Sequence, residues 1–377
     1  MKTVERVAGE PSGAEKDFAL FERLSADDYE QVIVLQNHET GLRGFLVIHD
    51  SSLGPACGGV RIKRYPSERD ALEDALRLAR GMTYKASLAG LPCGGGKTVL
   101  VEHEGLKREA AFESFGALVE SFNGRYFCAR DVGITDSDLA ALARATRYVA
   151  RDPAPGLGDV SEHTAIGVCH ALRACLEFAG IRGRVRVALQ GAGSVGAWIA
   201  RILAREGMDL LVADVDEARA AAVARETGAR AVPPAEILRT DAEVLAPCAL
   251  GGVLNRETIP RLRCRIVCGC ANNMLATPED GDALAARGVL YAPDYLANAG
   301  GLIRGVEYFL MGRSGSRASL ERIHARTLEI FRAARERGIS PVRAADQLAE
   351  ARLKPRKTFR DVTWRADLRP PALTPLT

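Results

Sequence analysis

The chain has little net charge and no long apolar run. Its 377 residues include 51 basic and 48 acidic side chains, a formal charge of +3, so charge does not point to nucleic acid or an anionic membrane as partner. No apolar stretch reaches the roughly 18 residues of a membrane-spanning helix. The N-terminal segment MKTVERVAGEPSGAEKDF has no apolar run resembling a signal peptide. These absences favour a cytoplasmic protein.

Paired cysteine spacing is also lacking. The nine cysteines are scattered along the sequence, which is typical of reduced thiols in the cytosol. Cys264, Cys268 and Cys270 come closest to a metal-binding cluster. They have no second pair and no nearby histidine, so we expect no metal site.

Two lysines stand out in the segment GMTYKASLAGLPCGGGKTVL, residues 81–100. Lys85 and Lys97 lie among small residues, although lysine is rarely buried without a partner. A desolvated lysine beside another cation has a lowered pKa and can act as a base near neutral pH. We expect Gly94, Gly95 and Gly96 to let the backbone approach a ligand, with positive φ where required. The segment predicts a site for anion binding and proton transfer. It does not match a P-loop, because Leu91 stands where the first glycine is required.

The length of the chain predicts two domains, because it exceeds what one core usually serves. In the first half we expect strands at 31–36 and 44–49, helices starting at Ser67 and at about 108–122, a strand ending at Asp131, and a helix from Thr135 to roughly Tyr148. Residues 151–160 are rich in proline and glycine and are typical of a hinge. After a helix at about 162–179, strands and helices alternate, which predicts a parallel, doubly wound sheet. A long helix follows around Leu320–Phe331, and the tail from about Lys354 has no periodicity.

A dinucleotide site is predicted at G-x-G-x-x-G, formed by Gly191, Gly193 and Gly196 with Ser194 and Val195 between the last two. The motif follows the expected strand VRVALQ and opens a helix, which is the required context. The helix N-terminus would meet the pyrophosphate. The next strand ends at Asp214, whose carboxylate suits the ribose hydroxyls and repels a 2′-phosphate. This favours NAD over NADP, with Asp216 as the alternative ribose partner.

A nicotinamide cofactor implies hydride transfer, and the charged residues indicate the donor. One lysine ammonium can pair with a substrate carboxylate, the other can activate water, and Asp131 can hold and deprotonate an amino group. These roles fit oxidative deamination of an amino acid. None of the six histidines has the setting that a 2-hydroxy-acid dehydrogenase would need.

Eight segments carry a resemblance to a known family, over roughly residues 30–352. Besides the glycine motif they are LGPACGGVRI, DALRLARGMTYKA, GGGKTV, NGRYFCARDVG, APCALGGVLN, CGCANNM and YAPDYLANAGG. The chain resembles the leucine, phenylalanine and valine dehydrogenases, relatives of glutamate dehydrogenase. The resemblance implies an α/β fold with two domains across a deep cleft. A substrate-binding and catalytic domain would cover residues 1–150 and a returning segment at about 342–377, and a Rossmann-type NAD domain would cover 151–341. It also implies a homo-oligomer, in which strands near 31–49 are candidates for pairing between subunits.

The resemblance further assigns roles to individual residues. Lys85 would bind the substrate carboxylate, Lys97 would be the general base, and Asp131 the catalytic aspartate. Asn273 and Asn298 would lie beside the substrate. Residues near the nicotinamide would be Asn272 and Thr164.

Departures from the family pattern concern the side chain of the substrate. Cys57 and Gly305 stand where leucine-type enzymes commonly carry larger residues, and the other expected lining positions are Gly59, Ala129 and Leu302. Such a pocket favours a larger side chain, aromatic ones included.

Other departures leave alternatives open. Arg130 stands where an acid is common; it either lowers the Asp131 pKa or faces solvent. His163 is expected to be a loop residue. A glutamate dehydrogenase would need a further cation, for which Arg304 is the candidate. A non-catalytic sensor of amino acids or NAD is the remaining alternative.

Overall fold

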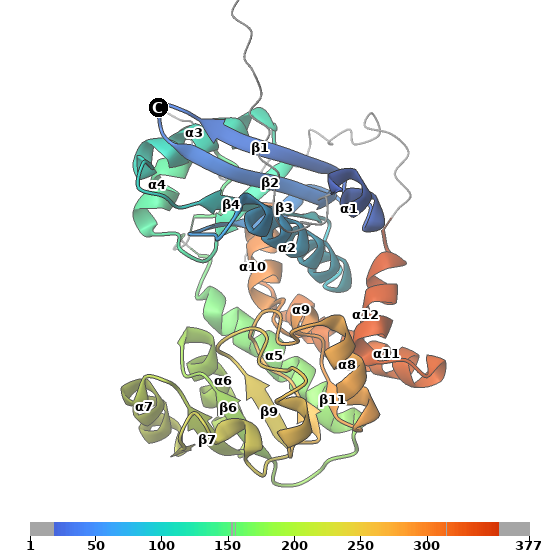
Figure 1. Cartoon of the computed structure of the whole chain (residues 1–377). Helices are drawn as coiled ribbons and strands as arrows, with labels where there is room; N and C mark the ends of the chain where they lie inside the picture. Colours follow the sequence, from blue (N-terminus) through green and yellow to red (C-terminus); the bar gives the residue numbers. More distant parts are fainter. Residues whose placement is uncertain (1–18, 152–153, 155, 314, 354–377) are drawn as a thin grey trace, which may run out of the picture.

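The computed structural model describes residues 19–151, 154, 156–313 and 315–353. They form two lobes, each built around one sheet, with several helices between them (Figure 1). The expected α/β fold, with a mixed N-terminal sheet and a parallel C-terminal sheet, is confirmed. The tail from Lys354, on which we predicted no periodic structure, lies outside the described residues.

The N-terminal sheet has five strands: β1 (Gln31–Asn37), β2 (Leu42–Asp50), β3 (Ala56–Lys63), β4 (Gly94–Val101) and β5 (Tyr126–Arg130). Their order is β1-β2-β4-β3-β5, so β1 is an edge strand. The pairs β1–β2 and β2–β4 are antiparallel, whereas β3 runs parallel to both β4 and β5. The sequence analysis missed β3, and it missed that the segment GGGKTVLV is itself the central strand of this sheet.

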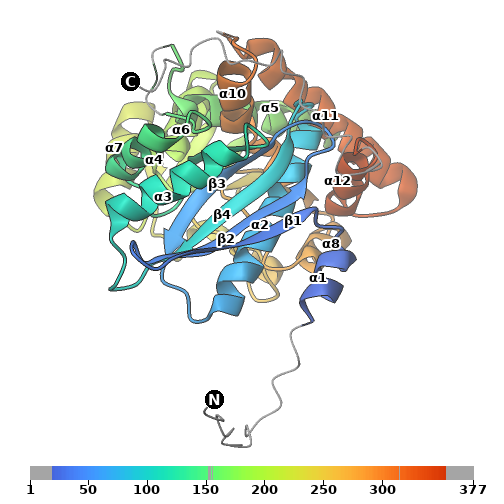
Figure 2. The same ribbon diagram turned by 90° about the horizontal axis from the view of Figure 1, so that it is seen from above.

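Helix α2 (Glu68–Leu88) covers one face of this sheet, and α3 (Arg108–Ser121) and α4 (Asp136–Ala145) cover the other (Figure 2). The short α1 (Leu20–Ala26) precedes the sheet. The expected caps are present: Ser67 accepts a hydrogen bond from the Asp70 N–H, and Thr135 forms a capping box. Helix α4 ends earlier than predicted, before the buried Thr146.

The three glycines before Lys97 do not form a ligand-binding loop, so this prediction was wrong. None of them has a positive φ. A Cβ on Gly94 would lie 1.9 Å from the Asp50 carbonyl oxygen, and one on Gly95 would lie 2.0 Å from the Thr83 nitrogen. Glycine is required here because the backbones of β4, β2 and α2 approach closely. The glycines thereby hold Lys97 at a fixed position on a rigid strand.

The C-terminal sheet has six parallel strands: β6 (Arg186–Gln190), β7 (Asp209–Ala213), β8 (Arg230–Ala231), β9 (Val244–Pro247), β10 (Ile266–Val267) and β11 (Leu290–Tyr291). Their order is β11-β10-β9-β6-β7-β8, with every pair parallel. This is the doubly wound order, in which ligands bind at the carboxyl ends of the strands where the order reverses. Here that point lies between β6 and β9. The helices around the sheet are α5 (Val160–Phe178), α6 (Ser194–Arg205), α7 (Glu217–Thr227) and α8 (Pro278–Ala286).

Four helices complete the described chain: α9 (Asp294–Ala297), α10 (Gly300–Phe309), α11 (Arg317–Arg337) and α12 (Pro341–Glu350). Helix α12 returns to pack against α2. The Tyr84 hydroxyl donates to Glu350 at 2.6 Å, and the Ser87 hydroxyl donates to the Ala349 carbonyl at 2.7 Å. One buried core includes the end of α2 and the apolar faces of α5, α11 and α12, so the two lobes share apolar packing. None of the described helices is long and apolar enough to cross a membrane.

Candidate active site

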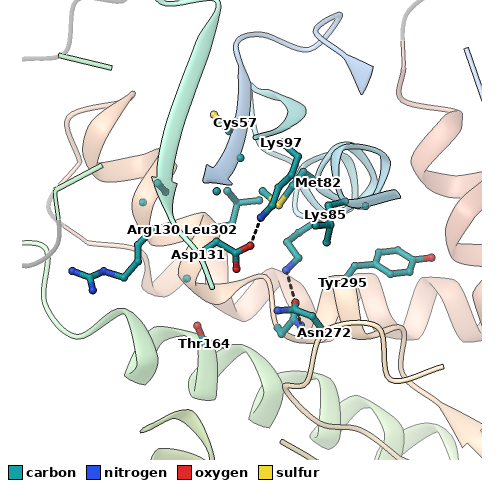
Figure 3. Close-up of a pocket in the computed structure, with 18 of the residues that line it drawn as sticks. Cys57, Met82, Lys85, Lys97, Arg130, Asp131, Thr164, Asn272, Tyr295 and Leu302 are labelled. Carbon is teal, nitrogen blue, oxygen red and sulfur yellow. Dashed lines mark hydrogen bonds and ion pairs between the residues drawn. The ribbon is translucent and has the colours of Figure 1, made fainter. Parts of the chain in front are cut away.

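A cavity of about 460 Å³ lies between the lobes, with walls from both of them. The first lobe contributes α2, β3, β4 and the end of β5, and the second contributes α5, α9, α10 and the loop after β10 (Figure 3). The predicted site residues that line it are Cys57, Gly59, Lys85, Lys97, Ala129, Asp131, Thr164, Val195, Asn272, Asn273, Asn298, Leu302 and Gly305. The structure therefore brings together residues that are more than two hundred positions apart in the sequence.

Lys97 and Asp131 form an ion pair in this cavity. The distance from the Lys97 Nζ to the Asp131 Oδ2 is 2.6 Å, and the Arg61 Nε donates to the same oxygen at 2.9 Å. Lys97 is 5% exposed. Gly59 on the adjacent strand leaves the space for this contact, since a Cβ there would lie 3.0 Å from the Lys97 Nζ and 2.8 Å from the Asp131 Cβ.

The electrostatics of this pair suit proton transfer. Burial lowers the pKa of Lys97, Asp131 partly offsets that effect, and Arg61 adds to it. Burial opposes ionisation of Asp131, but Lys97 and Arg61 outweigh it and lower the pKa of its carboxyl group. Asp131 is thus ionised, and the ammonium of Lys97 gives up its proton more readily than that of an ordinary lysine.

Lys85 lies across the cavity from this pair and contacts the asparagines of the second lobe (Figure 3). Its Nζ is 3.5 Å from the Asn272 Oδ1, which also accepts a hydrogen bond from the Asn298 Nδ2 at 2.9 Å. Burial lowers the pKa of Lys85 to about 8, Asp294 opposes this shift, and Lys97 adds to it. The Asn298 Oδ1 is buried without a hydrogen-bond partner, so this amide keeps a free acceptor within the site.

The glycine motif of the second lobe has the shape of a dinucleotide-binding turn. Gly191 has a φ of 107°, and a Cβ on Gly196 would lie 2.1 Å from the Gly191 carbonyl oxygen. A Cβ on Gly193, in contrast, meets nothing within 4 Å, so the space in front of it is open. Gly193 is the N-cap of α6 and no side chain caps this helix, so its first N–H groups face outward from Ser194. A helix N-terminus of this kind fits a pyrophosphate.

Asp214 lies directly after β7, beside this turn. Its carboxylate accepts hydrogen bonds from the Ala192 N–H at 2.7 Å and the Asp216 N–H at 2.9 Å. Asp216, the alternative ribose partner, instead caps α7 by accepting from Ala218 and Arg219. The turn residues other than Val195 do not line the cavity itself.

Part of the cavity wall is apolar. Phe127 and Phe309 lie in its wall with their ring centroids 5.9 Å apart. The space in front of the Gly305 Cα is open, since a Cβ on this residue would meet nothing within 4 Å. The remaining apolar lining includes Met82, Leu302 and Val306.

Three residues singled out in the sequence lie elsewhere or point elsewhere. Arg130 is directed away from Asp131 (Figure 3) and pairs with Asp136; the cation beside Asp131 is Arg61. His163 is not a loop residue, because it lies in the first turn of α5 with its Nδ1 2.7 Å from the Asp159 carbonyl oxygen. Arg304 is 1% exposed and does not line the cavity.

Arg304 instead holds the connection between the lobes. Its Nε donates to the Leu157 carbonyl at 2.7 Å, its Nη1 to the Arg313 carbonyl at 3.0 Å, and its Nη2 to the Gly156 carbonyl. A buried guanidinium that lies outside the cavity and donates to three backbone carbonyls is not available to a second carboxylate of a substrate. The suggestion that Arg304 serves a glutamate substrate was therefore wrong.

None of the nine cysteines forms a disulfide. All nine are free thiols; Cys268 donates to the Val168 carbonyl and Cys270 to the Cys248 carbonyl. Within the described part of the chain, no group of three histidine, cysteine or acidic side chains could hold a metal ion.

Several residues of the cavity were not predicted, among them Arg61, Asp294 and Phe309. Arg61 and Asp294 both lie within segments that carried the resemblance, VRI and APDYL, and an isolated charge inside an apolar segment was the available signal. Phe309 fell in a stretch without a predicted element, although its spacing from Leu302 and Val306 is helical.

The doubly wound sheet with its glycine turn, placed against a buried lysine–aspartate pair, defines a nucleotide-dependent dehydrogenase. Comparison with known proteins specifies which one. A model of the Glu/Leu/Phe/Val dehydrogenase dimerisation domain matches residues 30–148, and a glutamate/leucine/phenylalanine/valine dehydrogenase model matches residues 212–347. The chain belongs to the Glu/Leu/Phe/Val dehydrogenase family and is an amino-acid dehydrogenase.

Its relatives include enzymes for aliphatic and for aromatic amino acids. Leucine dehydrogenase from Geobacillus stearothermophilus is 42% identical over 343 residues, which cover 89% of this chain and 93% of the relative. Phenylalanine dehydrogenase from Caldalkalibacillus thermarum is 39% identical over 350 residues, covering 89% and 94%. The crystal structure of L-tryptophan dehydrogenase from Nostoc punctiforme superposes with a TM-score of 0.79 at 38% identity, covering 89% of this chain and 98% of that one.

Proposed function

We propose that this protein catalyses the NAD-dependent oxidative deamination of an L-amino acid with a large apolar or aromatic side chain, giving the 2-oxo acid and ammonia. The observation that carries the proposal is the buried Lys97–Asp131 pair, 2.6 Å apart, facing Lys85 across one cavity. A carboxylate-binding ammonium, a base and an acid are the groups that this reaction requires.

Each charged residue has one part in the proposed reaction. The Lys85 ammonium pairs with the substrate carboxylate, aided by the asparagine side chains beside it. Asp131 accepts a hydrogen bond from the substrate amino group and takes its proton. Once hydride has left Cα, Lys97 in its neutral form takes a proton from the water that attacks the resulting imine. Asp131 then returns its proton to the nitrogen of this adduct, and the carbon–nitrogen bond breaks to release ammonia and the 2-oxo acid. The lowered pKa of Lys97 supports this role, because a base must be partly deprotonated at the working pH.

The dinucleotide fits the second lobe. The open space at Gly193 and the uncapped N-terminus of α6 suit the pyrophosphate, and Val195 and Thr164 lead from there into the cavity. When bound, the cofactor accepts the hydride from Cα. The carboxylate of Asp214 beside the glycine turn supports NAD, since it would repel the 2′-phosphate of NADP.

The apolar wall supports a large side chain. Gly305 leaves room where any other residue would project into the cavity. The rings of Phe127 and Phe309 offer faces and edges against which an aromatic substrate can pack. A glutamate substrate is disfavoured because Arg304, the candidate cation for its second carboxylate, lies outside the cavity and donates to backbone carbonyls.

We also propose a homo-oligomer and the domain division predicted from sequence. Edge strand β1, with Val34 72% exposed, offers unpaired backbone groups to a second subunit, and the first matched family model describes a dimerisation domain. The packing of α12 against α2 supports a first domain of residues 1–150 completed by the segment at about 342–377. Residues 151–341 would then form the nucleotide domain.

A substrate panel tests the proposal. We expect reduction of NAD with L-phenylalanine, L-tryptophan or a large aliphatic amino acid, weak activity with NADP, and none with L-glutamate. Lys97→Ala should abolish turnover while NAD still binds. NAD binding without turnover of any amino acid would contradict the enzyme proposal and favour a sensor.

A further inference from the structure

Asp294 lies at the bottom of the cavity, and the reaction proposed above does not use it. It is the first residue of α9, is 6% exposed, and lines the cavity together with Lys85. A carboxylate this deeply buried requires compensation by hydrogen bonds or by an opposite charge. Its contacts therefore indicate what it does.

Two backbone groups on different segments bind this carboxylate. The Met274 N–H donates to the Asp294 Oδ2 at 3.1 Å, and the Tyr295 N–H donates to its Oδ1 at 2.9 Å. Both oxygens act as acceptors, and these hydrogen bonds together with Lys85 oppose burial, which raises the pKa of the Asp294 carboxyl group. The carboxylate thus joins the start of α9 to the loop that follows β10.

That loop carries the asparagines of the site in a strained conformation. Asn273 has a φ of 53°, in the left-handed region, which costs a residue other than glycine free energy. It lies directly between Asn272, whose side chain reaches Lys85, and Met274, whose N–H is held by Asp294. The carboxylate therefore helps to fix the turn that presents Asn272 to the cavity.

The same carboxylate is the counter-charge of Lys85. Among the groups that act on Lys85, Asp294 and Asp131 favour the ammonium, whereas burial and Lys97 oppose it. Asp131 already has two cations in direct contact, Lys97 and Arg61. Asp294 makes no ion pair within 4 Å in the described structure, and Lys85, which lines the same cavity, is the cation whose charge favours its ionised form.

No other titratable group described around Lys85 and Asp294 takes the place of Asp294 as the counter-charge of Lys85. Burial raises the pKa values of the tyrosines that face Asp294, so they stay neutral. The titratable groups facing the Lys85–Asp294 pair from the packed elements are Lys97, Asp131, Tyr291 and Tyr295.

We propose that Asp294 is a positioning residue for substrate binding: it keeps Lys85 protonated and holds the Asn272–Asn273 turn against it, so that the substrate carboxylate meets an ammonium and an ordered amide. This inference rests on the proposed function, in which Lys85 binds the carboxylate. Asp294 itself does not touch the substrate in this account; it acts through Lys85 and the turn.

The test is the pH dependence of kcat/KM for the best amino acid in Asp294→Asn and Asp294→Ser. Both variants remove the charge, and asparagine keeps one acceptor oxygen for the turn. The alkaline limb of kcat/KM, which reports the free enzyme, should move to lower pH by about one unit, the scale on which an opposite charge shifts a neighbouring pKa. KM should rise more than kcat falls.

Asp346→Asn is the matched control. Asp346 is a half-buried carboxylate near Tyr295, whose hydroxyl donates to it at 2.6 Å, and it lies outside the cavity. Its replacement should leave the alkaline limb in place. Profiles of the Asp294 variants that superpose on that of the parent enzyme would overturn the proposal. Failure of both variants to fold would also overturn it, because the role would then be structural.

Binding of 3-phenylpropionate, a carboxylate without an amino group, separates this inference from the proposed function. Titration calorimetry across pH measures its affinity without turnover. As pH rises, the affinity for 3-phenylpropionate should begin to fall at a lower pH in Asp294→Asn than in the parent enzyme. If the parent enzyme deaminates no amino acid, the proposed function fails, while this titration still decides whether Asp294 controls Lys85.

Discussion

Replacing Gly305 with leucine should exchange the substrate preference from aromatic to small aliphatic side chains. Gly305 lies within α10, its φ is not positive, and a Cβ there would meet nothing within 4 Å. The new side chain would therefore enter the cavity without disturbing the protein. It would occupy the space next to Phe127 and Phe309 that we assign to the substrate ring.

The magnitude follows from the burial that an aromatic substrate would lose. Full burial of a side chain of phenylalanine size contributes about 1.5–3 kcal/mol, so kcat/KM for phenylalanine and tryptophan should fall about 10- to 150-fold. Values for valine should change little, because its short side chain would not reach the space that the new leucine fills. Stability should rise slightly, because leucine in a helix is favoured over glycine by about 0.5–1 kcal/mol.

The assay is kcat/KM across phenylalanine, tryptophan, leucine and valine, with thermal unfolding as the control for folding. Gly59→Ala is the contrasting variant, because its Cβ would lie 3.0 Å from the Lys97 Nζ and should lower kcat with every substrate. Equal losses for aromatic and aliphatic substrates in Gly305→Leu would refute the placement of the substrate side chain.

Three further predictions concern the cofactor, the pH profile and the hinge. Asp214→Ser should raise kcat/KM for NADP relative to NAD, because it removes the charge that repels the 2′-phosphate; an unchanged ratio would argue against Asp214 as the ribose partner. Since the pKa of Lys85 is lowered to about 8, its ammonium is present below that pH and is lost above it, so the affinity for a substrate carboxylate, measured by titration, should fall as pH rises through 8. Arg304→Met should lower the midpoint of thermal unfolding, because it leaves the Leu157 and Arg313 carbonyls without their donors. An unsatisfied buried group costs about 1–3 kcal/mol. The ratio of activity between amino acids should not change, as it would if Arg304 contacted the substrate.

Local patterns predicted much of the fold. The caps at Ser67 and Thr135, the glycine turn and the alternation after residue 160 are short-range signals whose meaning depends little on the rest of the chain. The GGGKTVLV segment was misinterpreted because three consecutive glycines are atypical of a strand. They are required there by the close approach of β2 and α2, which sequence spacing does not reveal.

The site shows the same division between local and long-range information. Lys85, Lys97 and Asp131 could be selected from their types and surroundings and from the family resemblance. The arginine that pairs with Asp131 could not be predicted in this way. Arg130 is its neighbour in sequence but points to Asp136, whereas Arg61 reaches Asp131 from β3. Arg304 was the candidate cation for a glutamate substrate. Its burial within α10 and its bonds to the hinge could not be predicted, because they depend on how the two lobes pack.

The central claim is that the Lys97–Asp131 pair performs chemistry on an amino acid. The most direct test is the formation of reduced nicotinamide, followed by absorbance in alkaline buffer, across a panel of L-amino acids with NAD or NADP, for the parent enzyme and Lys97→Ala. The account predicts turnover of large apolar or aromatic amino acids with NAD and loss of that turnover in the variant. Undiminished turnover in Lys97→Ala, or none in the parent enzyme while NAD binds, would contradict it.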